Sequence, residues 1–215
     1  LNCQFEGNHS TNRGARLWAL ECTAAITGCA FTRNESGNHG GAVHLEASTV
    51  TATDCMVRDN VCGYDGAQVD VRECGDLDVR FSNCTMSGLQ ASHEQSGHIR
   101  AFNSSPLVTQ CVLAFNNDGP AVYANEGSTP EIANCIVFEI ADGDSLPGYH
   151  HDNLFVDPLF CNIFNDDLDY CSNSLCLPSN NPWGLSVGTT RGVGCGECIT
   201  PVEPASWGLI KAMYR

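Results

Sequence analysis

A cysteine recurs every two dozen or so residues through the first two thirds of the chain. The intervals are 26, 26, 29, 27 and 24 residues, between Cys3, Cys29, Cys55, Cys84, Cys111 and Cys135. An apolar residue follows each cysteine by two positions, and from the second cysteine on another precedes it by three. Such self-similarity is typical of repeat folds, in which each unit stacks on its neighbours.

A second short strand is expected in each repeat, because apolar residues alternate at Leu17/Ala19, Val43/Leu45, Val69/Val71, Ile99/Ala101 and Val122/Ala124. Strands of three to five residues are too short to be stable alone. Equivalent strands stacked about 4.8 Å apart would bury these alternate residues in one continuous core. We therefore predict an all-β fold, a right-handed parallel β-helix of about six coils over residues 1–156, with three strands per coil.

Asparagines recur three positions after the apolar residue, at Asn8, Asn34, Asn60 and Asn116, with breaks at Leu89 and Ile140. Side-chain amides at equivalent positions of stacked coils can hydrogen-bond to one another. We expect an asparagine ladder at one corner of the coil, next to glycine pairs such as Gly40 and Gly41.

The motifs F-x-x-N ("FEGN", "FTRN") and G-G-A-V resemble the repeats of chlamydial polymorphic outer membrane proteins. They also resemble those of bacterial secreted right-handed β-helix repeat proteins. The segments "DPLFCN" (157–162), "NSLCLPSNNPWG" (173–184) and "GVGC" (192–195) resemble the closing segment of the latter group. The resemblance implies the fold but no particular activity, because β-helices serve as adhesins, lyases, hydrolases and scaffolds alike.

The charge balance excludes some partners. The chain has 10 basic and 25 acidic residues, a net charge of −15. Nucleic acids and anionic membranes need clustered Lys and Arg, so we expect neither as a partner. The sequence contains no run of 18 apolar residues, so we expect no membrane-spanning segment. Leu1 already falls inside a repeat, without a signal-peptide pattern, which suggests a processed protein or the end segment of a longer one.

The cysteine content points to an extracellular or cell-surface protein, because 14 cysteines accompany a single lysine. We expect the six-cysteine column to be buried free thiols, since stacked parallel strands orient Cβ atoms alike and disfavour disulfides. Cys22 and Cys74 fall at matching positions, with Ala47 assigned to the coil between them. Disulfides are expected among the later cysteines, with no pairing deducible. The alternative is a zinc site of Cys171, Cys176, Cys195 and Cys198.

Two columns of side chains should point outward from the second strand. They are Trp18, His44, Asp70, Arg100 and Tyr123, and beside them Leu20, Glu46, Arg72, Phe102 and Asn125. The favoured interpretation is a ladder of charges on an exposed sheet face. The alternatives are a carbohydrate-binding surface in the first column, or a polysaccharide lyase-like enzyme using Glu46, Asp70, Arg72 and Arg100. We assign no catalytic residue.

Candidate metal ligands occur in one irregular segment, at Asp142, Asp144, His150, His151 and Asp152. Carboxylates would suit calcium and adjacent histidines a transition metal. Segments of this composition are more often solvated turns, so we expect no cofactor, with calcium as the possible exception.

The two ends of a solenoid expose unpaired backbone groups. We expect residues 157–198 to cap the last coil, with Trp183 over it, and residues 199–215 to form a linker and docking tail carrying Trp207, Ile210, Met213 and Tyr214. At the other end Leu1, Cys3 and Phe5 should be open to docking. The sequence predicts a non-catalytic structural, adhesion or self-assembling module, whose partner is a second copy stacked head to tail or a cell-surface glycan.

Overall fold

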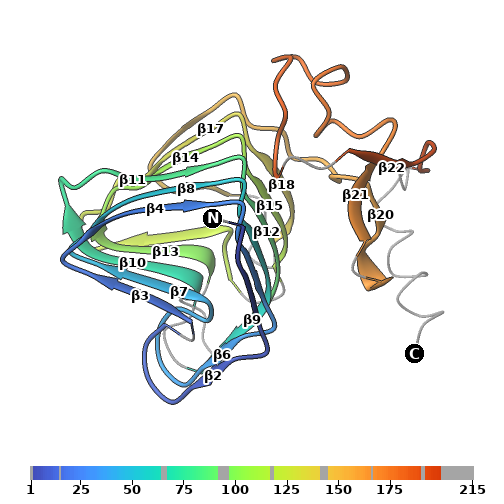
Figure 1. The fold of residues 1–215 in the computed structure, drawn as a ribbon. Coiled ribbons are helices and arrows are strands. Elements are labelled where there is room, and N and C mark those ends of the chain that lie inside the picture. Colours follow the sequence, from blue (N-terminus) through green and yellow to red (C-terminus); the bar gives the residue numbers. More distant parts are fainter. Residues whose placement is uncertain are drawn as a thin grey trace.

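Three parallel sheets form the walls of a solenoid of about six coils (Figure 1). The computed structural model describes residues 2–14, 16–63, 67–91, 97–116, 119–140, 145–165, 167–189 and 192–199. Every strand pair between coils is parallel, so each strand lies above its equivalent in the preceding coil. The predicted all-β solenoid is confirmed.

The strands have these bounds. Sheet A contains β1 (Gln4–Glu6), β5 (Ala30–Thr32), β9 (Met56–Cys62), β12 (Thr85–Ala91), β15 (Val112–Asn116) and β18 (Ile136–Ile140), with β2 (His9–Ser10) and β6 (Glu35–Ser36) beside them. Sheet B contains β3 (Leu17–Leu20), β7 (Val43–Glu46), β10 (Ala67–Gly75), β13 (Gly97–Ser104) and β16 (Val122–Asn125). Sheet C contains β4 (Thr23–Thr27), β8 (Thr49–Thr53), β11 (Val79–Ser82), β14 (Leu107–Thr109), β17 (Glu131–Ala133) and β19 (Tyr149–His151).

The core is the set of inward columns that the repeat predicts. In sheet A, Phe5 pairs with Phe31 and Phe31 with Val57, and the two phenylalanine rings stack with centroids 4.8 Å apart. As expected, no disulfide joins the buried cysteines Cys29, Cys55, Cys84, Cys111 and Cys135; the expectation that Cys3 is buried with them was wrong, because Cys3 is exposed in the first coil. Burial and the neighbouring thiols raise the pKa of Cys111 well above its usual value, so this thiol stays protonated.

The asparagine ladder is present at its corner. The Asn8 amide donates to Asn34 Oδ1 at 2.8 Å, and the Asn34 amide donates to Asn60 Oδ1 at 2.9 Å. The coils are numbered 1 to 6 by their core cysteines, so that coil 1 contains Cys3 and coil 4 contains Cys84. Coil 4 has Leu89 at the next ladder position, and there Gln68 takes over, accepting from Asn60 and donating to the Ser87 carbonyl. A glutamine from another strand thus satisfies the polar groups where the sequence repeat breaks.

The corner before each core cysteine adopts the left-handed conformation. Its φ is positive in successive coils, at Gly28, Asp54, Asn83, Gln110 and Asn134. This conformation costs most residues free energy and is least costly for Gly, Asn and Asp, which explains the turn-prone residues that precede the cysteines. The first four of these corner N–H groups donate to a carbonyl of the next coil, as Asp54 does to Ser82.

One assignment of the repeat was wrong. Ser48, rather than Ala47, lies in the column between Cys22 and Cys74. Ser48 Oγ accepts from the Cys22 N–H at 3.1 Å, and Ser104 Oγ accepts from the Cys74 N–H at 3.0 Å. Small hydroxyl or thiol side chains therefore hold this corner.

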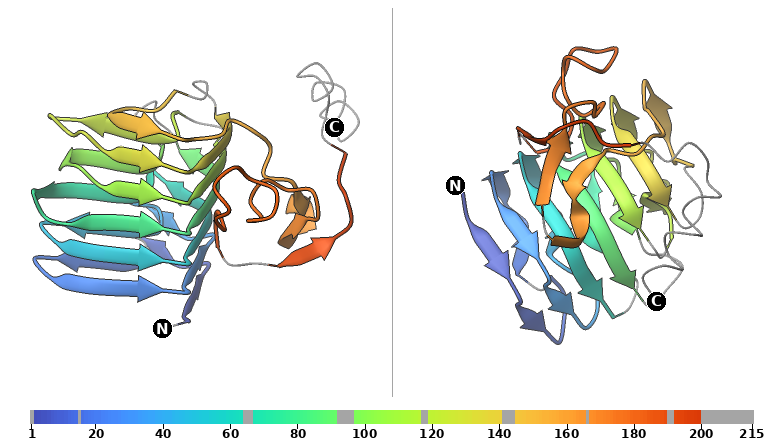
Figure 2. Two further views of the ribbon diagram at one scale, coloured as in Figure 1. Left: turned by 90° about the horizontal axis from the view of Figure 1, so that it is seen from above. Right: turned by 90° about the vertical axis from the view of Figure 1, so that its right-hand side faces the viewer.

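The segment expected to close the last coil lies instead along the side of the solenoid (Figure 2). This cap segment, residues 157–198, contains β20 (Phe160–Asn162), η1 (Ile163–Asn165), β21 (Asp167–Cys171) and β22 (Val193–Cys195). In Figure 1 it stands beside the wall formed by β12, β15 and β18. Its Tyr170, Val187 and half-buried Trp183 cluster with the outward residues Val112 and Ile136 of sheet A. The outer face of sheet A is apolar at these coils, and the cap segment buries it.

Polar contacts fix the cap segment at three successive levels of the stack. Arg58 Nη2 donates to the Ile163 carbonyl at 3.1 Å, Thr85 Oγ1 lies 3.1 Å from Thr189 Oγ1, and the Gly188 N–H donates to the Gln110 carbonyl. At the end of the stack, Leu146 packs on the core and Leu154 forms a bridge to Ile136. Over the described residues, no helix has the length and apolar character needed to cross a membrane.

Candidate functional site

The first outward column of sheet B was the strongest site candidate in the sequence, and the structure brings its members into register. Trp18 pairs with His44, His44 with Asp70, Asp70 with Arg100, and Arg100 with Tyr123. His44 Nδ1 lies 2.8 Å from Asp70 Oδ2, and Arg100 Nη1 lies 3.5 Å from Asp70 Oδ1. A carboxylate between an imidazole and a guanidinium forms the centre of the column.

The centre of this column is buried, so the expectation of an exposed charge ladder was wrong there. His44 and Asp70 have 0% exposed surface and Arg100 has 2%. Part of the cover comes from the connection between sheets A and B, where the His39 ring stacks 6.4 Å from the His44 ring. Gly40, with a φ of 64°, passes so close that a Cβ there would meet the Val43 carbonyl. A ligand therefore has no direct route to these three side chains.

Asp70 is held in its charged form. Burial alone would raise its pKa, but His44 and the charges of Arg72 and Arg100 outweigh burial and lower the pKa below its usual value. An ionised, buried carboxylate cannot supply a proton near neutral pH, which makes it unsuited to general acid catalysis.

The second outward column is more accessible, and its charged members Glu46 and Arg72 both have partners. Arg13 Nη1 lies 3.0 Å from Glu46 Oε2, and the Arg72 guanidinium lies 4.7 Å from the centre of the Phe102 ring. Within the two columns, the large exposed apolar side chains lie in coil 1, where Trp18 is 53% exposed and Leu20 48%. The sequence did not identify Arg13 or His39 as part of this site, because both lie in connections that follow no repeat.

Trp18 and Tyr123 do not form one sugar platform. Three buried polar residues separate them in the column, a distance of about 19 Å at 4.8 Å per rung. A saccharide could contact one ring or the other. The column residues are thus adjacent as predicted, and any binding role for them stays a prediction.

The candidate metal ligands do not converge where the structure describes them. His151 Nδ1 lies 2.8 Å from Asp152 Oδ2 and its Nε2 lies 3.8 Å from Glu131 Oε1, and the hydrogen bond to Asp152 raises the pKa of His151. His150 is exposed beside them. Asp142 and Asp144 lie outside the described residues. Among the described residues, sulfurs alone form a group of three or more potential metal ligands, in the cap segment.

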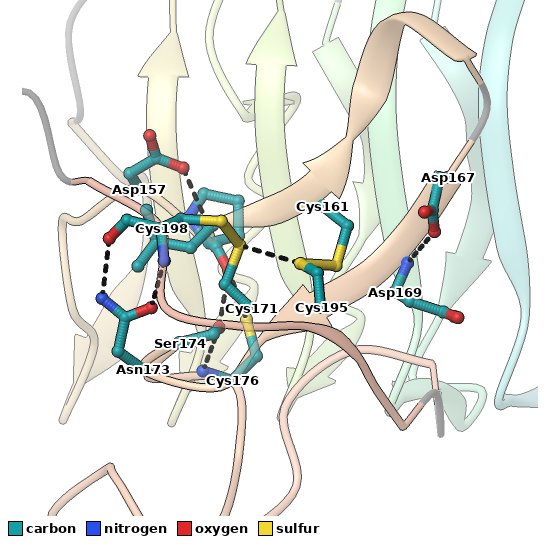
Figure 3. Close-up of a disulfide and its surroundings, with 12 residues drawn as sticks. Asp157, Cys161, Asp167, Asp169, Cys171, Asn173, Ser174, Cys176, Cys195 and Cys198 are labelled. Atoms are coloured by element: carbon teal, nitrogen blue, oxygen red, sulfur yellow. Dashed lines mark hydrogen bonds between the residues drawn. A yellow bond between two sulfur atoms is a disulfide. The ribbon is translucent and has the colours of Figure 1, made fainter.

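The cap segment contains two disulfides, which Figure 3 shows side by side. Cys161 is bonded to Cys195, and Cys171 to Cys198. The expected disulfides are confirmed, and they indicate an oxidising compartment. The zinc alternative had the wrong ligand set, because Cys176 is a separate buried thiol whose pKa burial raises to about 12.

The first coil presents open strand edges. Within the described residues, β1, β3 and β4 each pair with coil 2 on one side and with no strand on the other. The core residues Phe5, Leu17 and Ile26 are only partly buried there. Cys3 and Cys22, also in this coil, are the two exposed free thiols. Leu1 lies outside the described residues.

A comparison with known families places the fold. The family model described as "Right handed beta helix region" matches residues 24–174, more than half of the chain. No curated protein and no solved structure matches.

Proposed function

Because the chain belongs to the right-handed β-helix family, we propose that it is a non-catalytic structural module of the extracellular space or cell surface that associates end to end. The observation that carries the proposal is the first coil, where, among the described residues, three parallel strands have one unpaired edge each beside partly buried core residues. Exposed strand edges are templates for adding further strands. The two disulfides support an oxidising location.

The open edge has a defined set of donors. The N–H groups of Leu17 and Gly28 donate to coil 2, at the carbonyls of Ala42 and Thr53. Alternate residues of a strand direct their backbone groups to opposite sides. The backbone groups of Trp18 and Ala25 therefore point away from coil 2, toward a docking strand.

A second copy offers matching edges at its other end. Within the described residues, β19 pairs only with β17, and Leu154 is the last residue bridged to sheet A. All these strands run parallel, so copies stacked head to tail keep one strand direction. A contact between two different surfaces repeats without closing and gives filaments. The net charge of −15 opposes the contact, so salt should favour it.

The competing carbohydrate-active function has less support. Of its four proposed residues, Asp70 and Arg100 are buried, and Glu46 and Arg72 are engaged with Arg13 and Phe102. An extended polysaccharide needs several neighbouring accessible groups. A glycan partner would have to use exposed side chains such as Trp18 of coil 1.

The test is the assembly state of the full chain, by sedimentation velocity and negative-stain microscopy at low and high salt. We expect rods longer than one chain that become more abundant with salt. Ala25→Pro removes an N–H that faces outward and should leave single chains with an unchanged melting temperature. Ala25→Thr keeps that N–H and is the matched control, expected to assemble like the wild type. Single wild-type chains at every concentration and salt, or equal assembly by Ala25→Pro, would contradict the proposal.

The tail residues Trp207, Ile210, Met213 and Tyr214 lie outside the described residues. We propose that they reinforce the contact between copies. A chain ending at residue 202 should then form shorter assemblies than the full chain.

A further inference from the structure

Four sulfur atoms of the cap segment lie in one small cluster (Figure 3). Besides the two disulfides, Cys195 Sγ lies 3.5 Å from Cys171 Sγ. The sulfurs of Cys161, Cys171 and Cys195 all lie within 4.8 Å of one another, and Cys198 is bonded to Cys171. The cluster is only partly buried, since Cys161 and Cys195 keep some exposed surface.

Strand pairing and hydrogen bonds hold these positions independently of the sulfur–sulfur bonds: Phe160, next to Cys161, pairs with Tyr170, and Cys171 pairs with Cys195. The Cys171 N–H donates to the Leu159 carbonyl. Asn173 holds Cys198 at both backbone groups, accepting from its N–H at 3.0 Å and donating to its carbonyl at 2.9 Å. The Ser172 N–H donates to the Gly196 carbonyl, between Cys195 and Cys198. Reduction should therefore leave the four cysteines near one another.

We propose that in the reduced chain these four thiolates bind one Zn²⁺ ion. Zn–S bonds of about 2.3 Å place the sulfurs of a tetrahedral site about 3.8 Å apart. The cluster already has a 3.5 Å separation between its two pairs, so only the bonded sulfurs must move apart. Cα separations of 6.0 and 5.7 Å within the pairs leave room for that rotation. Cys195 and Cys198 also have the C-x2-C spacing of zinc sites.

In this proposal the reduced, zinc-bound state comes first, and the oxidised state with two disulfides follows it. A newly made chain carries thiols, and Zn²⁺ displaces their four protons on binding. Oxidation then forms two disulfides and releases the ion, and the four electrons pass to two equivalents of a disulfide oxidant, each of which becomes two thiolates. The ion holds the cap segment closed before the covalent bonds form. Metal binding also protects the thiolates from pairing with other cysteines during folding.

The test uses the full chain, reduced with a phosphine, desalted without air and titrated with Co²⁺ as a spectroscopic probe. We expect the absorption bands of tetrahedral cobalt–thiolate, saturating at one ion per chain and lost when Zn²⁺ is added. The oxidised protein should give no such bands. Cys176→Ser, which removes a nearby thiol outside the cluster, should keep the full signal.

Cys195→Ser with Cys198→Ser should abolish the cobalt spectrum, and Cys161→Ser alone should weaken binding at least tenfold. Circular dichroism of each variant checks that the coils remain folded. A reduced wild type without tetrahedral cobalt bands would overturn the proposal, as would a signal that survives the double substitution. The assembly experiment above has a different readout, so either proposal can fail alone.

Discussion

His98 is a titratable residue in the interior, and its surroundings keep it neutral. Its ring is fully buried, and its Nδ1 lies 2.9 Å from the side-chain amide of Gln68, which extends the asparagine ladder. Burial lowers its pKa from 6.5 to about 3, because an imidazolium in this interior would lose its hydration, and this outweighs a hydrogen bond to the Ala114 backbone, which raises the pKa. The folded protein therefore resists protonation at a site that the unfolded chain protonates readily.

We predict that His98 makes the protein less stable in mild acid. Between pH 6.5 and about 3 the unfolded chain binds one more proton here than the folded chain, so stability falls as pH falls through that window. At about 1.4 kcal/mol per pH unit, the loss at pH 5 is about 2 kcal/mol relative to pH 7. Urea unfolding at both pH values measures this.

His98→Asn should be less stable than the wild type at pH 7 yet lose about 2 kcal/mol less between pH 7 and pH 5. His150→Asn, at an exposed position, is the control and should follow the wild type. Identical pH dependence in wild type and His98→Asn would contradict the assignment.

The outward column shows which residue properties a sequence repeat can predict. Register follows from the period, so the adjacency of His44, Asp70 and Arg100 was predictable and is confirmed. Their burial was not, because the cover includes connections that vary in length and composition between coils. His39 covers His44 in coil 2, and no repeated residue marks it.

At the scale of elements, the cap segment shows the same limit. Its cysteine content predicted disulfides, and they are present. Its position beside sheet A was missed, although the outward residues Val112, Ile136 and Phe138 carried a signal. Outward positions of an exposed sheet are usually polar, and apolar ones at three places indicate a partner on that face.

We predict that Tyr170 attaches the cap segment to the solenoid. It is buried in one cluster with Val112 and Ile136 of sheet A, and its hydroxyl donates to the Val187 carbonyl within the cap segment at 3.1 Å. Tyr170→Ala should cost the cap segment about 3 kcal/mol or more, since it removes a large buried ring. Limited proteolysis should then cut within residues 157–198 at least a hundredfold faster.

Tyr149→Ala is the matched control, because Tyr149 is 65% exposed, and it should leave the proteolysis rate unchanged. Equal rates for Tyr170→Ala and the wild type would show that other contacts hold the cap segment.

At the scale of the whole molecule, stability should vary along the stack. Each coil contacts only its neighbours, so a terminal coil can open without breaking the rest. Among the described residues the first coil contacts one other coil, and its Phe5, Leu17 and Ile26 are only partly buried. The central coils are packed from both sides, and the cap segment also covers part of coils 3 to 6.

We predict that amide hydrogen exchange is fastest, among the solenoid strands, in β1, β3 and β4. The strands β9, β12 and β15 should exchange slowest, because opening them requires breaking two coil interfaces. Mass spectrometry of exchanged peptides measures this at low salt, where single chains should dominate. Equal protection in all coils would indicate that the stack opens only as a whole.

The contacts of the cap segment also determine where the solenoid can change its length. Arg58, Thr85 and Gln110 bind it at successive levels of the stack, so the cap segment spans a fixed number of coils. A coil inserted among these rungs would move its anchors out of reach by about 4.8 Å. None of these three contacts involves coil 1 or coil 2. Duplicating one of those coils would therefore lengthen the solenoid and leave the three contacts of the cap segment in place. Natural variation in coil number should therefore be confined to that end.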